Sequence, residues 1–342
     1  MNIEEFTGRI AADLQTTLPH KYAHVEVRSR NVEKIGGSYM GIELKPEGNI
    51  GPLLKIRKYY EEYMHGTPYF YVLNDIVKDA VDALDKTPTE LVIDIDKLEE
   101  NISMRVVQTE TNKKYLETIP HLEIEDLSII CKFNVEISTD DEGSIVISDE
   151  WLDRFNISEE ELFYIAKEHA PINRPDKIQS MNDVINALDP QAAENTPKSP
   201  LLVVTNESGI DGASVLFYPG ILERCADILN GNFYVLPSSI HEFLLWGEDE
   251  TMGAKELKAI VKEVNDNILE PEDLLSYNVY HYDWKEKVFE IADKYEARMK
   301  EKAKQSLMGN LEAKKHDLAR ESHLRRNQDI GCRRTQGGSL CL

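Results

Sequence analysis

The stretch FYVLPSSIHEFLLW, residues 233–246, decides the fold class, because it places two apolar runs one directly after the other. Residues 233–236 and 243–246 are rich in β-forming side chains, and only a short polar segment lies between them. Amphipathic helices are predicted on either side, at 221–229 and 257–268. The strands and helices therefore lack a regular βαβ rhythm. The chain is predicted to be α+β, with several short mixed or antiparallel sheets packed with helices.

Composition divides the chain of 342 residues into six segments. Proline and polar residues are concentrated at 189–200, as in a linker, and apolar periodicity and helix caps end near residue 327. The predicted segments are an N-terminal α+β unit (1–90), a middle α+β unit (91–188), the linker (189–200), a third α+β unit (201–283), a basic helical extension (284–326) and a disordered tail (327–342).

Local signals place elements inside the first two units. Asn2 begins a helix, with Glu5 at the position of a capping box, and 25–29 with 40–44 is predicted to form a hairpin. Gly66 and Pro68 separate two further helices.

The middle unit is predicted to hold strands at 104–107, 127–135 and 144–147, and a helix capped by Ser158 and Glu161. Ahead of the decisive stretch, strands are predicted at 201–204 and 213–217.

The charge is strongly negative and unevenly spread. The chain holds 39 Lys and Arg against 62 Asp and Glu, a net charge of −23. From Lys294 to the end there are 12 basic and 6 acidic residues, so the part before Lys294 carries −29 and the end carries +6. Such a body repels phosphate backbones and attracts basic surfaces. The expected partner is a protein with a basic surface, and sequence-specific binding of nucleic acid is not expected.

Common signatures of cofactor and metal enzymes are absent from the sequence. It has no P-loop, GxGxxG, HExxH, paired CxxC or GxSxG motif, and its four cysteines do not have metal-site or disulfide spacing. His281 and Asp283 form an HxD pair without a third ligand. No cofactor or metal is predicted. No apolar run approaches the roughly 20 residues of a membrane helix, and the acidic N-terminus differs from a signal peptide, so a cytoplasmic protein without membrane contact is expected.

The densest group of reactive side chains lies within the decisive stretch. Ser238, Ser239, His241 and Glu242 fall within five residues. Ser239, or alternatively Ser238, is a candidate nucleophile and His241 a candidate base. The competing interpretation is structural, since triad members usually come from distant positions and 237–239 is also typical of a turn.

Two more polar residues are candidates for lining the same pocket. Ser214 and Tyr218 belong to IDGASVLFYPGIL, residues 210–222. If Ser214 lies near Ser239, the two segments build a polar pocket. Alternatively, Tyr218 and Pro219 only shape the entry into the next helix.

Several segments together resemble a known family. IPHLEIEDLSIICKF (119–133), ISDEWLDRFNISEEEL (147–162), IDGASVLFYPGIL and VLPSSIHEF (235–243) occur in the order seen in an uncharacterised Firmicute family, number 5688 of the domain-of-unknown-function series. A more distant resemblance is to another uncharacterised Bacillus-type cytosolic family. Neither resemblance implies a reaction, a cofactor or catalytic residues. They imply a cytosolic bacterial protein, often of an accessory or mobile-element kind.

Two functions follow as hypotheses. The first is a non-catalytic, acidic protein that binds another macromolecule, one form of which is a nucleic-acid mimic. The alternative is a small-ligand-binding protein or hydrolase whose pocket is built by Ser214, Tyr218, Ser238, Ser239, His241 and Glu242. Oligomeric state and partner identity are left open.

Overall fold

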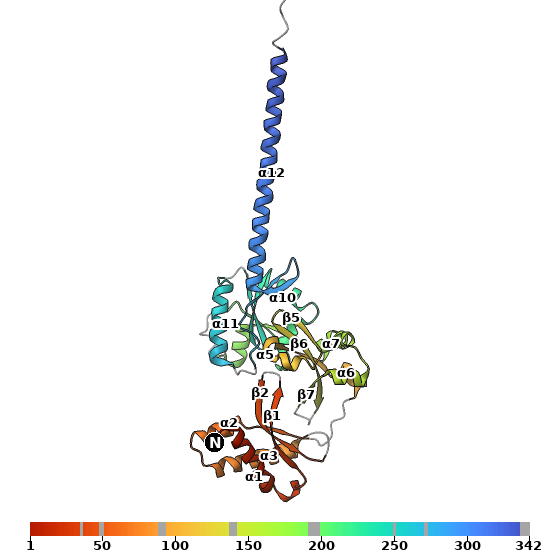
Figure 1. Cartoon of the computed structure of the whole chain (residues 1–342), viewed down its shortest axis with the longest axis vertical. Helices are drawn as coiled ribbons and strands as arrows, with labels where there is room; N and C mark the ends of the chain where they lie inside the picture. The colour runs from red at the N-terminus through yellow and green to blue at the C-terminus, as the bar shows by residue number, and fades with distance from the viewer. Residues whose placement is uncertain are drawn as a thin grey trace, which may run out of the picture. The chain divides into compact units, whose positions relative to one another are not determined.

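The structure, a computed structural model, describes residues 1–34, 37–47, 51–87, 94–136, 142–190, 199–248, 251–269 and 273–335. The chain divides into two compact units, Met1–Phe289 and Glu290–Leu342. The first unit holds three sheets with helices packed on them (Figure 1), and the α+β class predicted from the sequence is confirmed. The described strand registers are antiparallel.

Helices pack on one side of a three-stranded sheet at the N-terminus. The predicted capping box is present, since the Asn2 side chain accepts from Glu5 N and the Glu5 side chain accepts from Asn2 N. The predicted hairpin and the two helices separated at Gly66 and Pro68 are confirmed. The elements are α1 (Ile3–Thr17), η1 (His20–Tyr22), β1 (Glu26–Lys34), β2 (Gly37–Lys45), β3 (Leu53–Lys55), α2 (Arg57–Met64) and α3 (Tyr69–Lys86). Their shared core centres on fully buried Phe6, Ile10, Ile42 and Ile76.

The next sheet has β6 at its centre, with β4 on one edge and β5 and β7 on the other. Helix α7 begins at the predicted capping box of Ser158 and Glu161 and packs on β4 and β6. The predicted strands are confirmed, with somewhat different ends. The elements are η2 (Ile95–Lys97), α4 (Leu98–Asn101), β4 (Ile102–Gln108), α5 (Thr109–Leu116), β5 (His121–Ile124), β6 (Leu127–Glu136), β7 (Glu142–Val146), α6 (Asp149–Phe155) and α7 (Glu159–Asn173).

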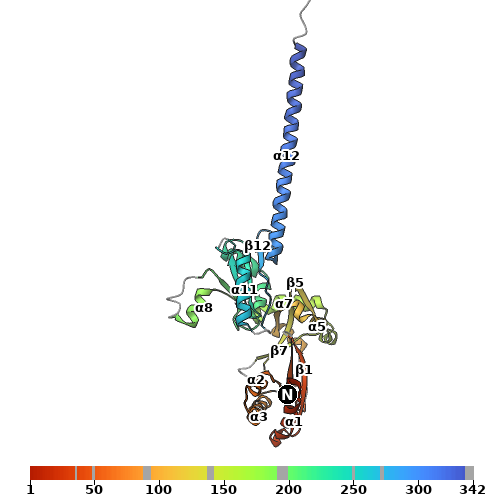
Figure 2. The ribbon, with the colours of Figure 1, turned by 60° about the vertical axis from the view of Figure 1, so that its left-hand side comes forward.

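The third sheet has six strands in the order β13-β12-β10-β11-β9-β8, and α11 packs against β10 (Figure 2). Its edge strand β8 comes from the segment 91–188 and pairs with β9 across the segment 189–200, of which 191–198 lie outside the described residues. The elements are β8 (Asp176–Ser180), α8 (Met181–Leu188), β9 (Leu202–Asn206), η3 (Gly212–Phe217), α10 (Ile221–Leu229), β10 (Phe233–Ser239), β11 (Glu242–Gly247), α11 (Ala254–Ile268), β12 (Tyr280–Asp283) and β13 (Val288–Ile291).

Two local predictions in this region were wrong. Residues 213–217 form the 3-10 helix η3 and not a strand, because the chain turns at Asp211 with a φ of 53° and the Ser214 N–H then donates to Asp211 O. Residues 237–239 belong to β10, with a bulge between Pro237 and Ser239, and the turn of this hairpin follows at 240–241. In both places, contacts with distant parts of the chain determine the local structure, and the apolar or proline pattern of the sequence does not.

A carboxylate fastens the β5–β6 turn to the segment that enters β12. Asp126 Oδ2 accepts from Ser276 Oγ at 2.6 Å and from Asn278 Nδ2 at 3.0 Å, while Asp126 Oδ1 accepts from Tyr280 Oη at 2.6 Å. Ser276 and Tyr280 are fully buried. These bonds connect residues about 150 positions apart in the chain and so hold the second and third sheets together.

The second unit contains the long helix α12 (Ala292–Thr335). The basic helix was expected over 284–326, whereas residues 284–287 form turns, β13 follows, and α12 continues past residue 327, where a tail was expected. Residues 336–342 lie outside the described part. Among the helices that the structure describes, none is long and apolar enough to cross a membrane.

Candidate functional site

The hairpin β10–β11 carries four of the residues that the sequence singled out. Ser238 Oγ donates to Glu242 Oε1 at 3.2 Å across the end of the hairpin. Ser239 Oγ accepts from the backbone N–H of His241 at 3.0 Å, which stabilises the tight turn. Both serine hydroxyls are therefore engaged in bonds within the hairpin itself.

Ser214 and Tyr218 lie on η3 and at its end. Ser214 is buried and its Oγ donates to the Asp211 carbonyl oxygen at 2.9 Å. Burial raises the pKa of Tyr218 to about 12, so this phenol stays protonated at neutral pH.

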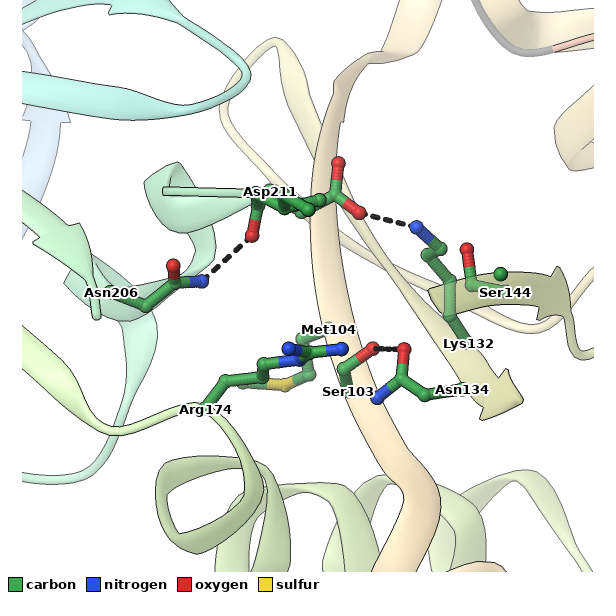
Figure 3. Close-up of a pocket in the computed structure, with 10 residues that line it drawn as sticks. Ser103, Met104, Lys132, Asn134, Ser144, Arg174, Asn206 and Asp211 are labelled. Carbon is green, nitrogen blue, oxygen red and sulfur yellow. Dashed lines mark hydrogen bonds and ion pairs between the residues drawn. The ribbon is translucent and has the colours of Figure 1, made fainter. Parts of the chain in front are cut away.

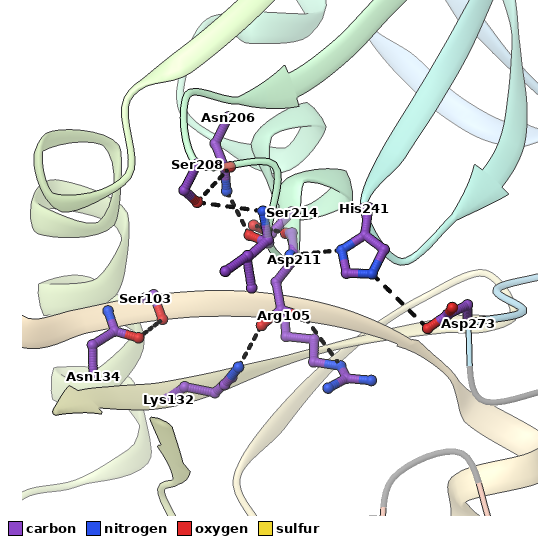
Figure 4. A network of polar contacts seen from close by, with 11 residues as sticks. Ser103, Arg105, Lys132, Asn134, Asn206, Ser208, Asp211, Ser214, His241 and Asp273 are labelled. Carbon is purple, nitrogen blue, oxygen red and sulfur yellow. Dashed lines mark hydrogen bonds and ion pairs between the residues drawn. The ribbon is translucent and has the colours of Figure 1, made fainter. Parts of the chain in front are cut away.

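The backbone of Asp211 brings two of the candidate residues together. The Asp211 N–H donates to His241 Nδ1 at 3.3 Å, and its carbonyl accepts the bond from Ser214 (Figure 4). This requires His241 to be unprotonated at Nδ1, and its Nε2 lies 3.9 Å from Asp273 Oδ1. Among the described contacts, no serine hydroxyl bonds to the His241 ring. In the described residues, Ser238 and Ser239 bond to the Glu242 carboxylate and the His241 backbone and not to the His241 ring.

Gly212 explains how the Asp211 loop comes so close to the hairpin. A Cβ at this position would lie 2.2 Å from Thr205 Oγ1 and 2.4 Å from His241 O. Thr205 Oγ1 also donates to His241 O at 2.8 Å. Only glycine permits this contact, which fixes the conformation of Asp211 next to it.

The Asp211 carboxylate, which sequence reasoning missed, pairs with two cations from the second sheet. Its Oδ2 accepts from Lys132 Nζ of β6, and its Oδ1 lies 3.5 Å from Arg105 Nε of β4. Asp211 and Lys132 are more than nine-tenths buried. A buried charge is costly unless it is paired, so Asp211 and Lys132 each need the other to be tolerated in the interior. The available signal was Lys132 itself, a lone charge in the apolar run LSIICKF.

Beside this ion pair lies a polar pocket with a volume of about 40 Å³ (Figure 3). Lys132, Arg174 and Asp211 contribute its charges. Ser103 Oγ donates to Asn134 Oδ1 at 3.0 Å, and Asn206 Nδ2 donates to Ile210 O at 2.7 Å, so the walls are held by their own hydrogen bonds. The neutral lining residues are Ser103, Met104, Asn134, Gly143, Ser144, Asn206 and Ile210.

The described residues contain no group of three or more His, Cys, Asp or Glu side chains arranged for a metal ion. His281 is buried with its Nε2 3.4 Å from Glu248 Oε1, and His121 Nδ1 lies 2.9 Å from Ile119 O. Cys225 is buried, and burial raises its pKa to about 12. The contacts of the two histidines and the burial of Cys225 are those expected of residues that support the fold.

The comparison with known families agrees with the order of segments. The model of a family of unknown function (DUF5688) matches residues 3–284. The chain belongs to this family. No curated protein and no solved structure matches this DUF5688 member. The matched range includes the Asp211 loop, the pocket and the β10–β11 hairpin, and it ends before α12 begins.

Proposed function

We propose that this DUF5688 member is a non-catalytic binding protein that takes a small polar molecule, or the polar end of one, into the pocket beside Asp211. The observation that carries the proposal is the pocket lining, in which Lys132, Arg174 and Asp211 converge with neutral hydrogen-bonding side chains. Ligand sites are concave and hold a few oriented polar groups.

The rigidity of the walls supports binding. Lys132 is held by Asp211, Asn134 by Ser103, and Asn206 by Ile210 O. A site whose side chains are already fixed loses little conformational entropy when a ligand enters. The absence of a hydrogen bond between a described serine hydroxyl and His241 favours binding over hydrolysis.

The test is a thermal-unfolding screen of the full chain against sugars, amino acids, carboxylates and phosphates. We expect at least one class to raise the unfolding midpoint of the wild type, because a ligand that binds only the folded state stabilises it. A pocket-filling variant, Ser144→Phe, is expected to lose that response, whereas Ser238→Ala, outside the pocket, keeps it. A screen in which no compound raises the wild-type midpoint, or in which Ser144→Phe responds equally, would overturn the proposal.

A second candidate function rests on charge. The net charge of −29 on the part before Lys294 favours a protein partner with a basic surface. One form of this proposal is an accessory or mobile-element role, including that of a nucleic-acid mimic. Association with such a partner is expected to weaken steeply as salt rises from about 0.1 M to 0.5 M, because the screening length falls. Binding of a purified basic partner that does not change with salt would contradict it.

A further inference from the structure

The pocket brings two basic side chains together in a chain that is strongly anionic. Lys132 and Arg174 line it, and Asp211 is the acidic residue among its lining residues. The lining therefore holds two basic side chains and one acidic side chain, in a chain with a net charge of −23. Cations gathered at a concave site in a body of opposite sign favour an anionic ligand.

Lys132 has donor capacity beyond its ion pair. Its ammonium group carries three N–H donors, and among the described residues the bond to Asp211 is the one that it makes. The side chain is nevertheless more than nine-tenths buried. A buried donor needs an acceptor, and the pocket is where one fits.

The neutral lining residues also present donors. Because Ser103 Oγ donates to Asn134 Oδ1, the Asn134 amide nitrogen keeps its two N–H donors, for which the described residues supply no acceptor. The hydroxyl of Ser144 lies on the facing strand β7, where residue 144 pairs with residue 134. Amide and hydroxyl donors beside two cations are typical of oxyanion recognition.

The size of the pocket limits the ligand. A water needs roughly 10 to 15 Å³ of such volume, so 40 Å³ holds about three waters or one compact group. This is the scale of an inorganic oxyanion or the terminal group of a larger molecule, and is too small for a nucleotide or a sugar ring.

We infer that the pocket binds a protonated oxyanion, with hydrogenphosphate as the ligand; this inference rests on the proposed function. The cations and donors bind the anionic oxygens. The Asp211 carboxylate repels an oxyanion that carries no proton, but accepts a hydrogen bond from a P–OH group. At neutral pH hydrogenphosphate has such a group, and sulfate does not. Phosphate is therefore bound in preference to sulfate.

The experiment is calorimetric titration of the full chain with inorganic phosphate and, separately, with sulfate at the same pH and ionic strength. Phosphate is expected to bind at least about 10-fold more tightly than sulfate. The reason is that phosphate donates one charge-assisted hydrogen bond to the Asp211 carboxylate, whereas sulfate is repelled by it. Arg174→Gln is expected to weaken phosphate binding about 10-fold. The matched control is Lys167→Gln, which removes one positive charge from an exposed position of α7 and leaves the affinity within about twofold.

Asp211→Asn tests the selectivity directly. Asn tolerates the left-handed backbone at this position, so the loop keeps its shape, while the carboxylate charge is removed. We expect the preference of phosphate over sulfate to fall to about threefold or less, with sulfate binding gained. If Asp211→Asn unfolds, the wild-type ratio alone decides. Equal binding of both anions by the wild type, no binding of either, or an Arg174→Gln variant that binds phosphate as tightly as the wild type would overturn the inference.

The two proposals fail in different ways. If the thermal screen finds that only neutral compounds stabilise the wild type through the pocket, the proposed function stands and the oxyanion inference is overturned. If phosphate binds and Ser144→Phe still binds it equally well, the ligand lies elsewhere and both are overturned.

Discussion

Replacing Asp126 by alanine tests whether one carboxylate holds the second and third sheets together. The substitution removes the carboxylate that accepts three side-chain hydrogen bonds. The Ser276 and Tyr280 hydroxyls, both fully buried, then lose this acceptor. An unsatisfied buried donor costs about 1–3 kcal/mol, so the two hydroxyls give a destabilisation of roughly 2–6 kcal/mol, to which the weaker loss at Asn278 adds. This is a large part of the stability of an ordinary domain.

The assay is urea unfolding of the full chain, followed by two spectroscopic probes to check for separate transitions. The double variant Asp126→Ala with Tyr280→Phe is informative, because it removes the stranded tyrosine hydroxyl. We expect the double variant to lose at least about 1 kcal/mol less than the sum of the two single losses. A loss below about 1 kcal/mol for Asp126→Ala, or strict additivity in the cycle, would refute the role of this carboxylate.

Three further predictions concern other parts of the chain. Gly212→Ala is expected to destabilise by about 2 kcal/mol or more in the same urea assay, since its Cβ would meet Thr205 Oγ1 at 2.2 Å, and an unchanged midpoint would show that the loop can move away. The hydrogen bond from Tyr59 lowers the pKa of Asp79, so this contribution to stability is full above the ordinary carboxyl pKa of about 3.9 and is lost as pH falls through the lowered value; Tyr59→Phe should therefore cost stability at pH 6 and less at pH 2.5, and equal costs at both would contradict the assignment. Burial raises the pKa of the Cys225 thiol to about 12 and also that of Cys131, so mass mapping after treatment with a thiol reagent at pH 8 should find both unmodified until urea is added, and modification in the folded chain would mean that these sites open.

The sequence predicted most elements whose signals are local. The capping boxes at Asn2 and Ser158, and the end of α10 at Asn230 with its φ of 58°, depend on a few neighbouring residues. The apolar run at 213–217 was wrongly predicted as a strand, because its helical turn depends on the close approach of Gly212 to His241 O. That contact joins positions about 30 residues apart and has no local pattern.

The candidate site shows the same limit. The group from Ser238 to Glu242 was predicted as a site because reactive side chains are densest there along the chain. In the structure, its two serine hydroxyls make hydrogen bonds that shape the hairpin. Lys132, Arg174 and Asp211 come from three separate segments, and only the packing of two sheets brings them together. The one early sign, a lysine inside an apolar strand, says that a partner must exist but does not say where in the sequence it lies.

Ser214, Ser239 and His241 hold Asp211 in position. Ser239 fixes the turn that carries His241, and His241 then accepts the Asp211 N–H, while Ser214 holds the carbonyl of the same residue. With both ends of its peptide held and Gly212 pressed against the hairpin, Asp211 stays in the left-handed conformation that directs its carboxylate to Lys132. A carboxylate that is fixed in this way can reject an unprotonated anion, because it cannot swing aside to avoid the repulsion. If the pocket binds an oxyanion as we propose, Ser214, Ser239 and His241 act one step away from the ligand, on the carboxylate that selects it.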